Sequence, residues 1–188
     1  YDVEAIHQSL TPWRVHNTTN AAGHHGGGMT DGFGGNITVR YMYDIYPDFN
    51  IDVATEQAAL LGADRIVLQY PMYWLSCPPL LKKWLDDVLT FGWAYGSTGT
   101  ALHGKELLVA VSVGGAGSAY GREGAHIYTI HEFLRPMQGT SRVIGTKYAV
   151  PFLSVGALEI TEEAIARRAQ DYAAVLQTPE LPLLDIFG

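Results

Sequence analysis

The stretch QYPMYWLSCPPLLKKW, residues Gln69–Trp84, decides the fold of this chain. The β-branched and apolar residues 65–70 predict a buried strand that runs into it. Residues 71–74 place a proline before three large side chains, and a Pro-Pro pair then opens an amphipathic helix over residues 79–89. Flat side chains between prolines at the carboxyl end of a strand predict a platform for a flat ligand, because open α/β sheets bind ligands at this edge.

Strands and helices alternate on both sides of this stretch. The near-continuous apolar run 106–113 is typical of a central parallel strand that is buried on both faces. The alternation predicts an α/β fold in which helices cover a parallel sheet. The other predicted strands are 37–43 and 143–150, and the other predicted helices are 53–61, 126–134 and 161–177.

Residues 1–37 differ from the rest of the chain. Seven of the thirteen residues between Gly23 and Gly35 are Gly, a composition that is unlike a helix. Pro12 interrupts the one candidate strand, so no clean apolar strand precedes residue 38. We therefore expect an atypical Gly-rich segment, residues 1–37, and one domain, residues 38–188, whose sheet has an atypical or missing first strand.

The composition narrows the class of protein. A net charge of −7 without any basic run argues against a nucleic-acid partner. The lone Cys77 excludes an internal disulfide and fits a reducing compartment. The chain shows neither a secretory signal pattern nor an apolar run long enough for a membrane helix, so we expect a cytoplasmic protein. His24-His25 lacks partners at metal-ligand spacing, and we expect no metal site.

Six motifs occur in a fixed order and spacing along the chain. They are YPDFNID (46–52), QYPMYW (69–74), PPLLKKWLD (78–86), GWAYG (92–96), ALHGK (101–105) and GGAGSAY (114–120). Together they resemble the flavodoxin-like NAD(P)H:quinone oxidoreductases, in particular the branch with the ancillary subunits of bacterial glutathione-gated potassium efflux systems. The resemblance implies a flavodoxin-like three-layer sandwich with a parallel sheet of order 2-1-3-4-5. It also implies FMN as cofactor, with FAD as the alternative, and NAD(P)H as electron donor.

The resemblance implies that two loops hold the flavin ring. Backbone N–H groups in both loops would meet the ring, and glycines would let the second backbone come close. The alternative interpretations are that Tyr73 and Trp74 are core aromatics and that the glycines only form a tight turn. In the family a His-Pro loop after the first strand binds the flavin phosphate, and His16 falls at nearly that position. The implied flavin-binding residues are Pro71, Met72, Tyr73, Trp74, Leu75, Val113, Gly114, Gly115, Ala116 and His16.

Tyr120 and His126 match, at six-residue spacing, a Tyr–His pair that lies over the flavin in related quinone reductases. Either side chain could donate a hydrogen bond or a proton to the quinone oxygen as negative charge develops on it. The alternative for His126 is a cap on the helix that follows. Trp93 and Tyr95 lie in a segment that closes the quinone pocket in the family, often across a dimer interface; as an alternative they are core aromatics.

The leading hypothesis is a flavin-dependent NAD(P)H:quinone oxidoreductase that works by a ping-pong mechanism, as a homodimer. In this mechanism NAD(P)H delivers two electrons and leaves before the quinone enters. A second hypothesis is a regulatory subunit docked on a potassium efflux transporter, peripheral to the inner membrane face. A third hypothesis, prompted by residues 1–37, is a degenerate relative that binds no flavin.

Overall fold

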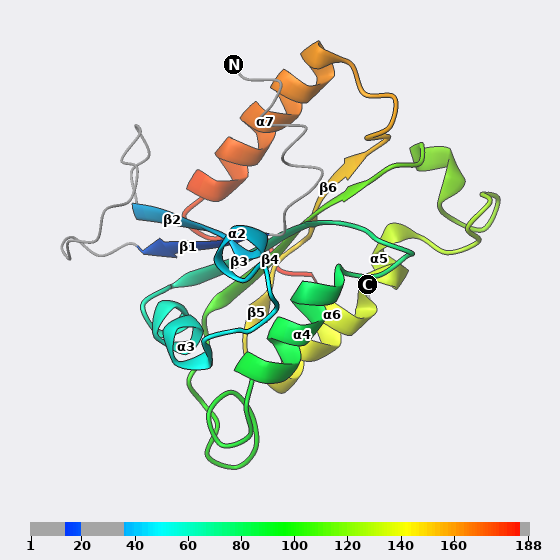
Figure 1. Cartoon of the computed structure of the whole chain (residues 1–188). Helices are drawn as coiled ribbons and strands as arrows, with labels where there is room; N and C mark the ends of the chain where they lie inside the picture. Colours follow the sequence, from blue (N-terminus) through cyan, green and yellow to red (C-terminus); the bar gives the residue numbers. More distant parts are fainter. Residues whose placement is uncertain (1–13, 20–35, 185–188) are drawn as a thin grey trace.

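The computed structural model describes residues 14–19 and 36–184 (Figure 1). The strands of this part are β1 (Arg14–Thr19), β2 (Asn36–Tyr41), β3 (Arg65–Pro71), β4 (Glu106–Val113), β5 (Lys147–Tyr148) and β6 (Phe152–Val155). The helices are α2 (Met42–Ile45), α3 (Val53–Leu61), α4 (Pro79–Val88), α5 (Ile130–Phe133), α6 (Arg135–Val143) and α7 (Glu162–Gln177), with a 3-10 turn, η2 (Gly117–Ala119).

The strands form one open sheet in the order β2-β1-β3-β4-β5, and β6 also pairs with β4. The predicted strand order is therefore confirmed. Strand β4 is parallel to β3 and β5, as predicted, and it is also parallel to β6, a strand that was not predicted. Strand β1 runs antiparallel to both β2 and β3, so the sheet is not parallel throughout. The first strand is thus present and atypical, in that it takes the usual position in the reverse direction.

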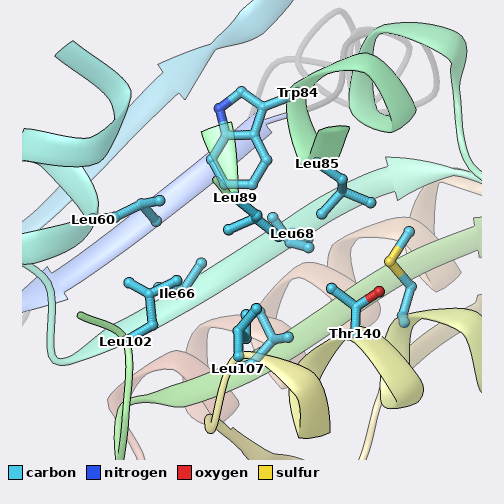
Figure 2. A pocket seen from close by; sticks show the side chains of 11 residues that line it. Leu60, Ile66, Leu68, Trp84, Leu85, Leu89, Leu102, Leu107 and Thr140 are labelled. Atoms are coloured by element: carbon cyan, nitrogen blue, oxygen red, sulfur yellow. The ribbon is translucent and has the colours of Figure 1, made fainter. Parts of the chain in front are cut away.

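Helices cover both faces of the sheet, with α4 and α6 on one side and α7 on the other (Figure 1). Figure 2 shows the centre of the first layer, where Trp84 of α4 and Leu60 of α3 lie with Ile66 and Leu68 of β3. The cavity left among these side chains is about 10 Å³, which is no more than one water needs. A ligand site must therefore lie outside this core.

In the described part of the chain, α7 forms the second layer, on the face of the sheet opposite α4 and α6. Tyr172, Val175 and Leu176 of α7 pack on the strand residues Val67, Leu108 and Ala110, together with Ala149, Leu181 and Phe152. The guanidinium of Arg168 lies 3.9 Å from the centre of the Phe152 ring and adds a cation–π contact. This layer packs helix α7 and Leu181 against the central strands of the sheet.

Local signals account for the elements that were predicted correctly. The helices 53–61 and 161–177 begin at Asp52 and Thr161, whose side chains accept hydrogen bonds from Thr55 N and Ala164 N. The strand 106–113 is found as predicted, and nearly all of its side chains are buried.

Three predicted elements are wrong in extent. The strand predicted at 37–43 ends at Tyr41, where α2 begins, and the strand predicted at 143–150 shrinks to Lys147–Tyr148, preceded by α6. The helix predicted at 126–134 is confined to Ile130–Phe133. The sequence Thr129-Ile-His-Glu132 forms a capping box at its start and could have given this boundary.

Glu56 is a buried carboxylate on α3, with 1% of its surface exposed. It accepts hydrogen bonds from the Tyr46 hydroxyl (2.8 Å) and the Trp84 indole (3.0 Å), and it pairs with Arg40 of β2. Burial and the hydrogen bond to Glu56 raise the pKa of Tyr46 to about 12, so the phenol stays a neutral donor at neutral pH. The Glu56 carboxylate thus links β2, α3 and α4 through Arg40 and Trp84.

Arg65 is a second buried charge, at the start of β3. Its guanidinium donates to Glu106 Oε2 (2.6 Å) and to the carbonyls of Leu176 (3.0 Å) and Thr178 (2.8 Å). Glu106 also accepts from Leu181 N at 3.0 Å. A cation at the carboxyl end of α7 suits the helix dipole, so Arg65 fixes this helix to the amino ends of β3 and β4.

Candidate functional site

Two loops leave the sheet side by side at the carboxyl ends of β3 and β4. In the parallel register Pro71 lies opposite Ser112, and Met72 N donates to Ser112 O at 2.8 Å. The platform loop (residues 72–78) and the glycine loop (residues 114–119) therefore start next to each other. This places the two loops predicted to bind the flavin at one edge of the sheet.

The platform loop contains a strained two-residue turn. Tyr73 and Ser76 exchange two backbone hydrogen bonds of 3.0 Å, and the residues between them, Trp74 and Leu75, have φ angles of 48° and 62°. Such a type I′ turn normally carries Gly or Asn, because other side chains are strained there. Trp74 is 98% exposed and Tyr73 is 40% exposed, so the alternative that they are core aromatics is wrong. A strained turn that lifts an indole into solvent indicates a ligand-binding surface.

The glycine loop is held by the segment that follows β6. Gly156 N donates to Gly115 O and Ala157 N to Val113 O, each at 3.0 Å. A Cβ atom on Gly114 would lie 3.0 Å from the Leu158 side chain, so this approach favours glycine. Neither β6 nor this support is among the elements predicted from the sequence, although the largely apolar segment 152–155 after a proline is a strand signal.

Tyr120 and His126 lie together at the end of the glycine loop. Their ring centroids are 4.7 Å apart and the rings are inclined by 35°. The Tyr–His loop (residues 119–128) closes on itself, since His126 N donates to Ala119 O and Gly121 N donates to Tyr128 O, both at 2.9 Å. The helix that follows is capped by Thr129, so the alternative that His126 is the cap is wrong.

The structure does not bring Trp93 and Tyr95 to this edge within one chain. Helix α4 runs back from the platform loop, and the segment 91–101 projects at the other end of the molecule from residues 114–128 (Figure 1). Trp93 packs against the core, whereas Tyr95 is 38% exposed and meets Phe91 edge to face at 5.7 Å. The interpretation as a core side chain therefore suits Trp93 and does not suit Tyr95.

Comparison with known proteins gives the family. A family model described as the flavodoxin-like fold matches residues 19–176. The chain belongs to the flavodoxin-like fold family. The ancillary protein KefF of the glutathione-regulated potassium-efflux system of Salmonella newport (strain SL254), a relative of this chain, is 47% identical over 137 residues, which cover 73% of this chain and 77% of KefF.

Two solved structures of this family agree with the fold. General stress protein 14 of Treponema denticola, in complex with FMN, is 42% identical with a TM-score of 0.66, over 70% of this chain and 75% of that one. An NADPH-quinone reductase from P. pentosaceus is 35% identical with a TM-score of 0.65, over 70% and 77% of the two chains. The resemblance to flavodoxin-like quinone oxidoreductases is confirmed, and as a member of this family the chain is an oxidoreductase.

The site fits the ring of FMN, the cofactor that this family implies. In the described part of the chain, no acceptor meets the backbone N–H groups of Trp74, Leu75, Gly114, Gly115 and Ala116. These donors belong to the two adjoining loops, and an isoalloxazine ring offers carbonyl oxygens and ring nitrogens that need such donors. The exposed Trp74 adds a flat apolar surface beside them. The residues present can therefore hold the ring end of FMN.

The phosphate end of the cofactor site was predicted at His16. This residue instead lies in the middle of β1, in register with Val67 of β3. Because β1 is antiparallel to β3, its last residues pair near Arg65, at the edge of the sheet opposite the two loops. The predicted position of His16 in a loop beside the ring site is therefore wrong. The residues after β1, numbers 20–35, lie outside the described part.

Neither a cluster of metal ligands nor a membrane-spanning helix occurs in the part of the chain that the structure describes. Within residues 14–19 and 36–184, no three His, Cys, Asp or Glu side chains gather as metal ligands, and His24-His25 falls outside this part. None of the helices in the same ranges combines the length and apolar character needed to cross a membrane.

Proposed function

We propose that the protein is an FMN-dependent NAD(P)H:quinone oxidoreductase. The observation that carries this proposal is the strained, exposed platform loop beside a glycine loop with unused backbone N–H donors, next to the Tyr120–His126 pair. When bound, FMN supplies two-electron chemistry, with hydride arriving from NAD(P)H and leaving to a quinone in a ping-pong cycle.

The residues of this chain would share the work of binding and proton supply. Backbone N–H groups of the platform and glycine loops would orient the ring and stabilise negative charge on its polar edge. Tyr120 and His126 would donate hydrogen bonds or a proton to the quinone oxygen that becomes negative during reduction. Tyr120 is well placed to hold a fixed position, because its ring also packs edge to face on Phe133 at 6.4 Å.

A second copy of the chain would complete the quinone pocket. The segment 91–101, which holds Trp93 and Tyr95, lies at the end of the molecule away from residues 114–128 (Figure 1), so a contact of these side chains with the quinone requires the partner subunit's loop. The exposed pair of Phe91 (72%) and Tyr95 (38%) gives this loop an apolar surface for such a contact. A homodimer with two shared sites is therefore part of the proposal.

The first test is the visible spectrum of the purified protein after incubation with FMN and removal of free FMN by desalting. We expect a retained flavin band near roughly 450 nm, as for bound oxidised flavin, and bleaching of that band when NAD(P)H is added without oxygen. Addition of a quinone should restore the band. A protein that retains neither FMN nor FAD would overturn the proposal and support a degenerate relative that binds no flavin.

The shared site is tested by mixing two defective variants. One carries Tyr120→Phe with His126→Asn, and the other carries Trp93→Ala with Tyr95→Ala. If each site uses one loop from each subunit, a mixed dimer has one site with all four changes and one site with none. Random mixing should then recover about a quarter of wild-type turnover, since half of the dimers are mixed. No recovery on mixing, with dimers present, would contradict the shared site.

The relation to KefF favours a second candidate function, namely a regulatory subunit of a potassium efflux transporter. In this case the main role of the protein would be to bind the transporter, and its flavin site would have a secondary role. Co-purification of the protein with a membrane transporter from its own cells, at equal stoichiometry, would support this role. If the protein reduces quinones and no transporter is recovered with it after cross-linking, the regulatory role is contradicted.

A further inference from the structure

An open groove of about 600 Å³ lies next to the Tyr–His loop, on the side of α5 and the start of α6. Its walls come from the loop itself, from these helices and from the C-terminal segment. The polar and aromatic side chains of its lining include Arg122, Tyr128, His131, Glu132 and Arg135. The volume falls within the range of small-molecule sites, and nothing in the proposed roles above uses it.

The groove is basic on an acidic protein. It gathers the guanidinium groups of Arg122 and Arg135 and the imidazole of His131, although the whole chain carries a net charge of −7. In the described part of the chain, Nδ1 of His131 is buried and has no hydrogen-bond partner. Two guanidinium groups at one groove are suited to a phosphate monoester, which each can bind through paired N–H donors.

Among the described lining residues Glu132 is the acidic one, and its carboxylate is bound by the start of its own helix. Glu132 Oε2 accepts hydrogen bonds from Thr129 N (2.7 Å) and Thr129 Oγ1 (2.8 Å). These hydrogen bonds, and secondarily the charges of Arg122 and Arg135, lower the pKa of the Glu132 carboxyl. The carboxylate therefore serves the capping box and keeps its negative charge, and the two arginines exceed it by one positive charge among the described lining residues.

The groove also offers a flat apolar surface that leads to the proposed hydride site. Tyr128 is 55% exposed, and its ring meets Phe133 at 5.9 Å, while Phe133 meets Tyr120 at 6.4 Å. The ring of Phe133 thus contacts both Tyr128 in the groove and Tyr120 of the Tyr120–His126 pair. Ile127, at the rim of the groove, has a φ angle of 65° and is 62% exposed, so the loop holds a strained residue where a ligand would pass.

We propose that this groove binds the adenosine 2′-phosphate end of NADPH, and that Arg122 and Arg135 make the protein select NADPH over NADH. This inference rests on the proposed function, because the nicotinamide must reach the flavin ring beside Tyr120. Tyr128 gives the adenine a surface on which to stack, and the arginines hold the phosphate monoester that NADH lacks. The groove and the hydride site then bind the two ends of one extended dinucleotide.

The proposal is tested on the FMN-loaded protein with steady-state kinetics. We expect a KM for NADPH at least about tenfold below that for NADH, and Arg122→Gln or Arg135→Gln should raise only the NADPH value, by about tenfold each. The kcat should stay within about twofold, because neither arginine is placed at the reacting atoms. Arg142→Gln, an exposed change on α6 outside the groove, is the matched control. Equal KM values for the two nucleotides in the wild type would overturn the proposal.

A binding measurement separates this inference from the proposed function. Calorimetry should show that adenosine 2′,5′-bisphosphate binds at least about tenfold more tightly than adenosine 5′-monophosphate, and that Arg122→Gln and Arg135→Gln remove the difference. Inorganic phosphate should compete only weakly; if it competes as well as the bisphosphate, the site is a general phosphate site and the nucleotide assignment is wrong. If neither NADPH nor NADH reduces the bound flavin, the proposed function fails, while these titrations still decide what the groove binds.

Discussion

Replacing Tyr120 by Phe together with His126 by Asn is expected to slow quinone reduction by about 10²–10⁴-fold, the usual contribution of positioned proton donors. Phe keeps the edge-to-face contact of residue 120 with Phe133, whose ring centroid lies 6.4 Å away. Asn is close to the imidazole in size and cannot act as an acid. The change therefore removes the two side chains that could give up a proton, while the packing on Phe133 is kept.

Rapid-mixing kinetics of the two half-reactions distinguishes this role from a structural one. The reduction of bound flavin by NADPH should keep its rate within about threefold, and only the reoxidation by quinone should slow, because only the quinone oxygen needs the donors. His103→Asn and Tyr41→Phe are matched controls at exposed positions outside the site. If both half-reactions slow equally, or if neither slows, the proposed roles of Tyr120 and His126 are wrong.

Replacing Glu56 by Ala is expected to lower the free energy of unfolding by about 3–5 kcal/mol, as is usual when one partner of a buried ion pair is removed. The change leaves Arg40 without its partner and takes an acceptor from the buried Tyr46 hydroxyl and the Trp84 indole. The loss should appear in urea denaturation at unchanged m-value. Glu159→Ala, at an exposed position, should change stability by less than about 0.5 kcal/mol.

A double variant shows whether the buried charge is the cause. Arg40→Met combined with Glu56→Leu removes both charges and refills most of the volume, so it should be more stable than Glu56→Ala alone. Glu56→Leu alone refills the volume but leaves Arg40 unpaired, so the double variant should also be more stable than Glu56→Leu if the unpaired charge is the cause. A Glu56→Ala protein within about 1 kcal/mol of the wild type would show that this cluster is not buried in the way the structure describes.

Elements with a strong local signal could be predicted from the sequence. The strand 106–113 is a continuous apolar run, and the helix 53–61 is bounded by a capping Asp and a Gly, so neighbouring residues alone identify them. Helix α6 could not be found in this way. Its sequence RPMQGTSRV contains Pro and Gly, and it buries the polar Gln138 and Ser141 beside Met137. Its stability comes from tertiary packing, which overrides weak helix propensity.

The candidate site shows the same division. The alternation of strand and helix predicts that the loops after residues 71 and 113 meet at one edge, because parallel strands end together. The spacing could not show that Trp74 would be 98% exposed on a strained turn, nor that residues 156–158 would support the glycine loop. It also could not show that the segment 91–101, with Trp93 and Tyr95, projects at the other end of the molecule from residues 114–128 (Figure 1).

The sequence by itself determined the family, the strand order and the two loops at the edge of the sheet, because these depend on motifs and on periodicity along the chain. Only the tertiary structure decided the reversed direction of β1, which moves His16 away from the ring site. It also decided the burial of Glu56 and Arg65, whose partners lie up to 114 residues away along the chain. Charged residues resemble surface residues in a sequence, and only contacts between distant segments make their burial favourable.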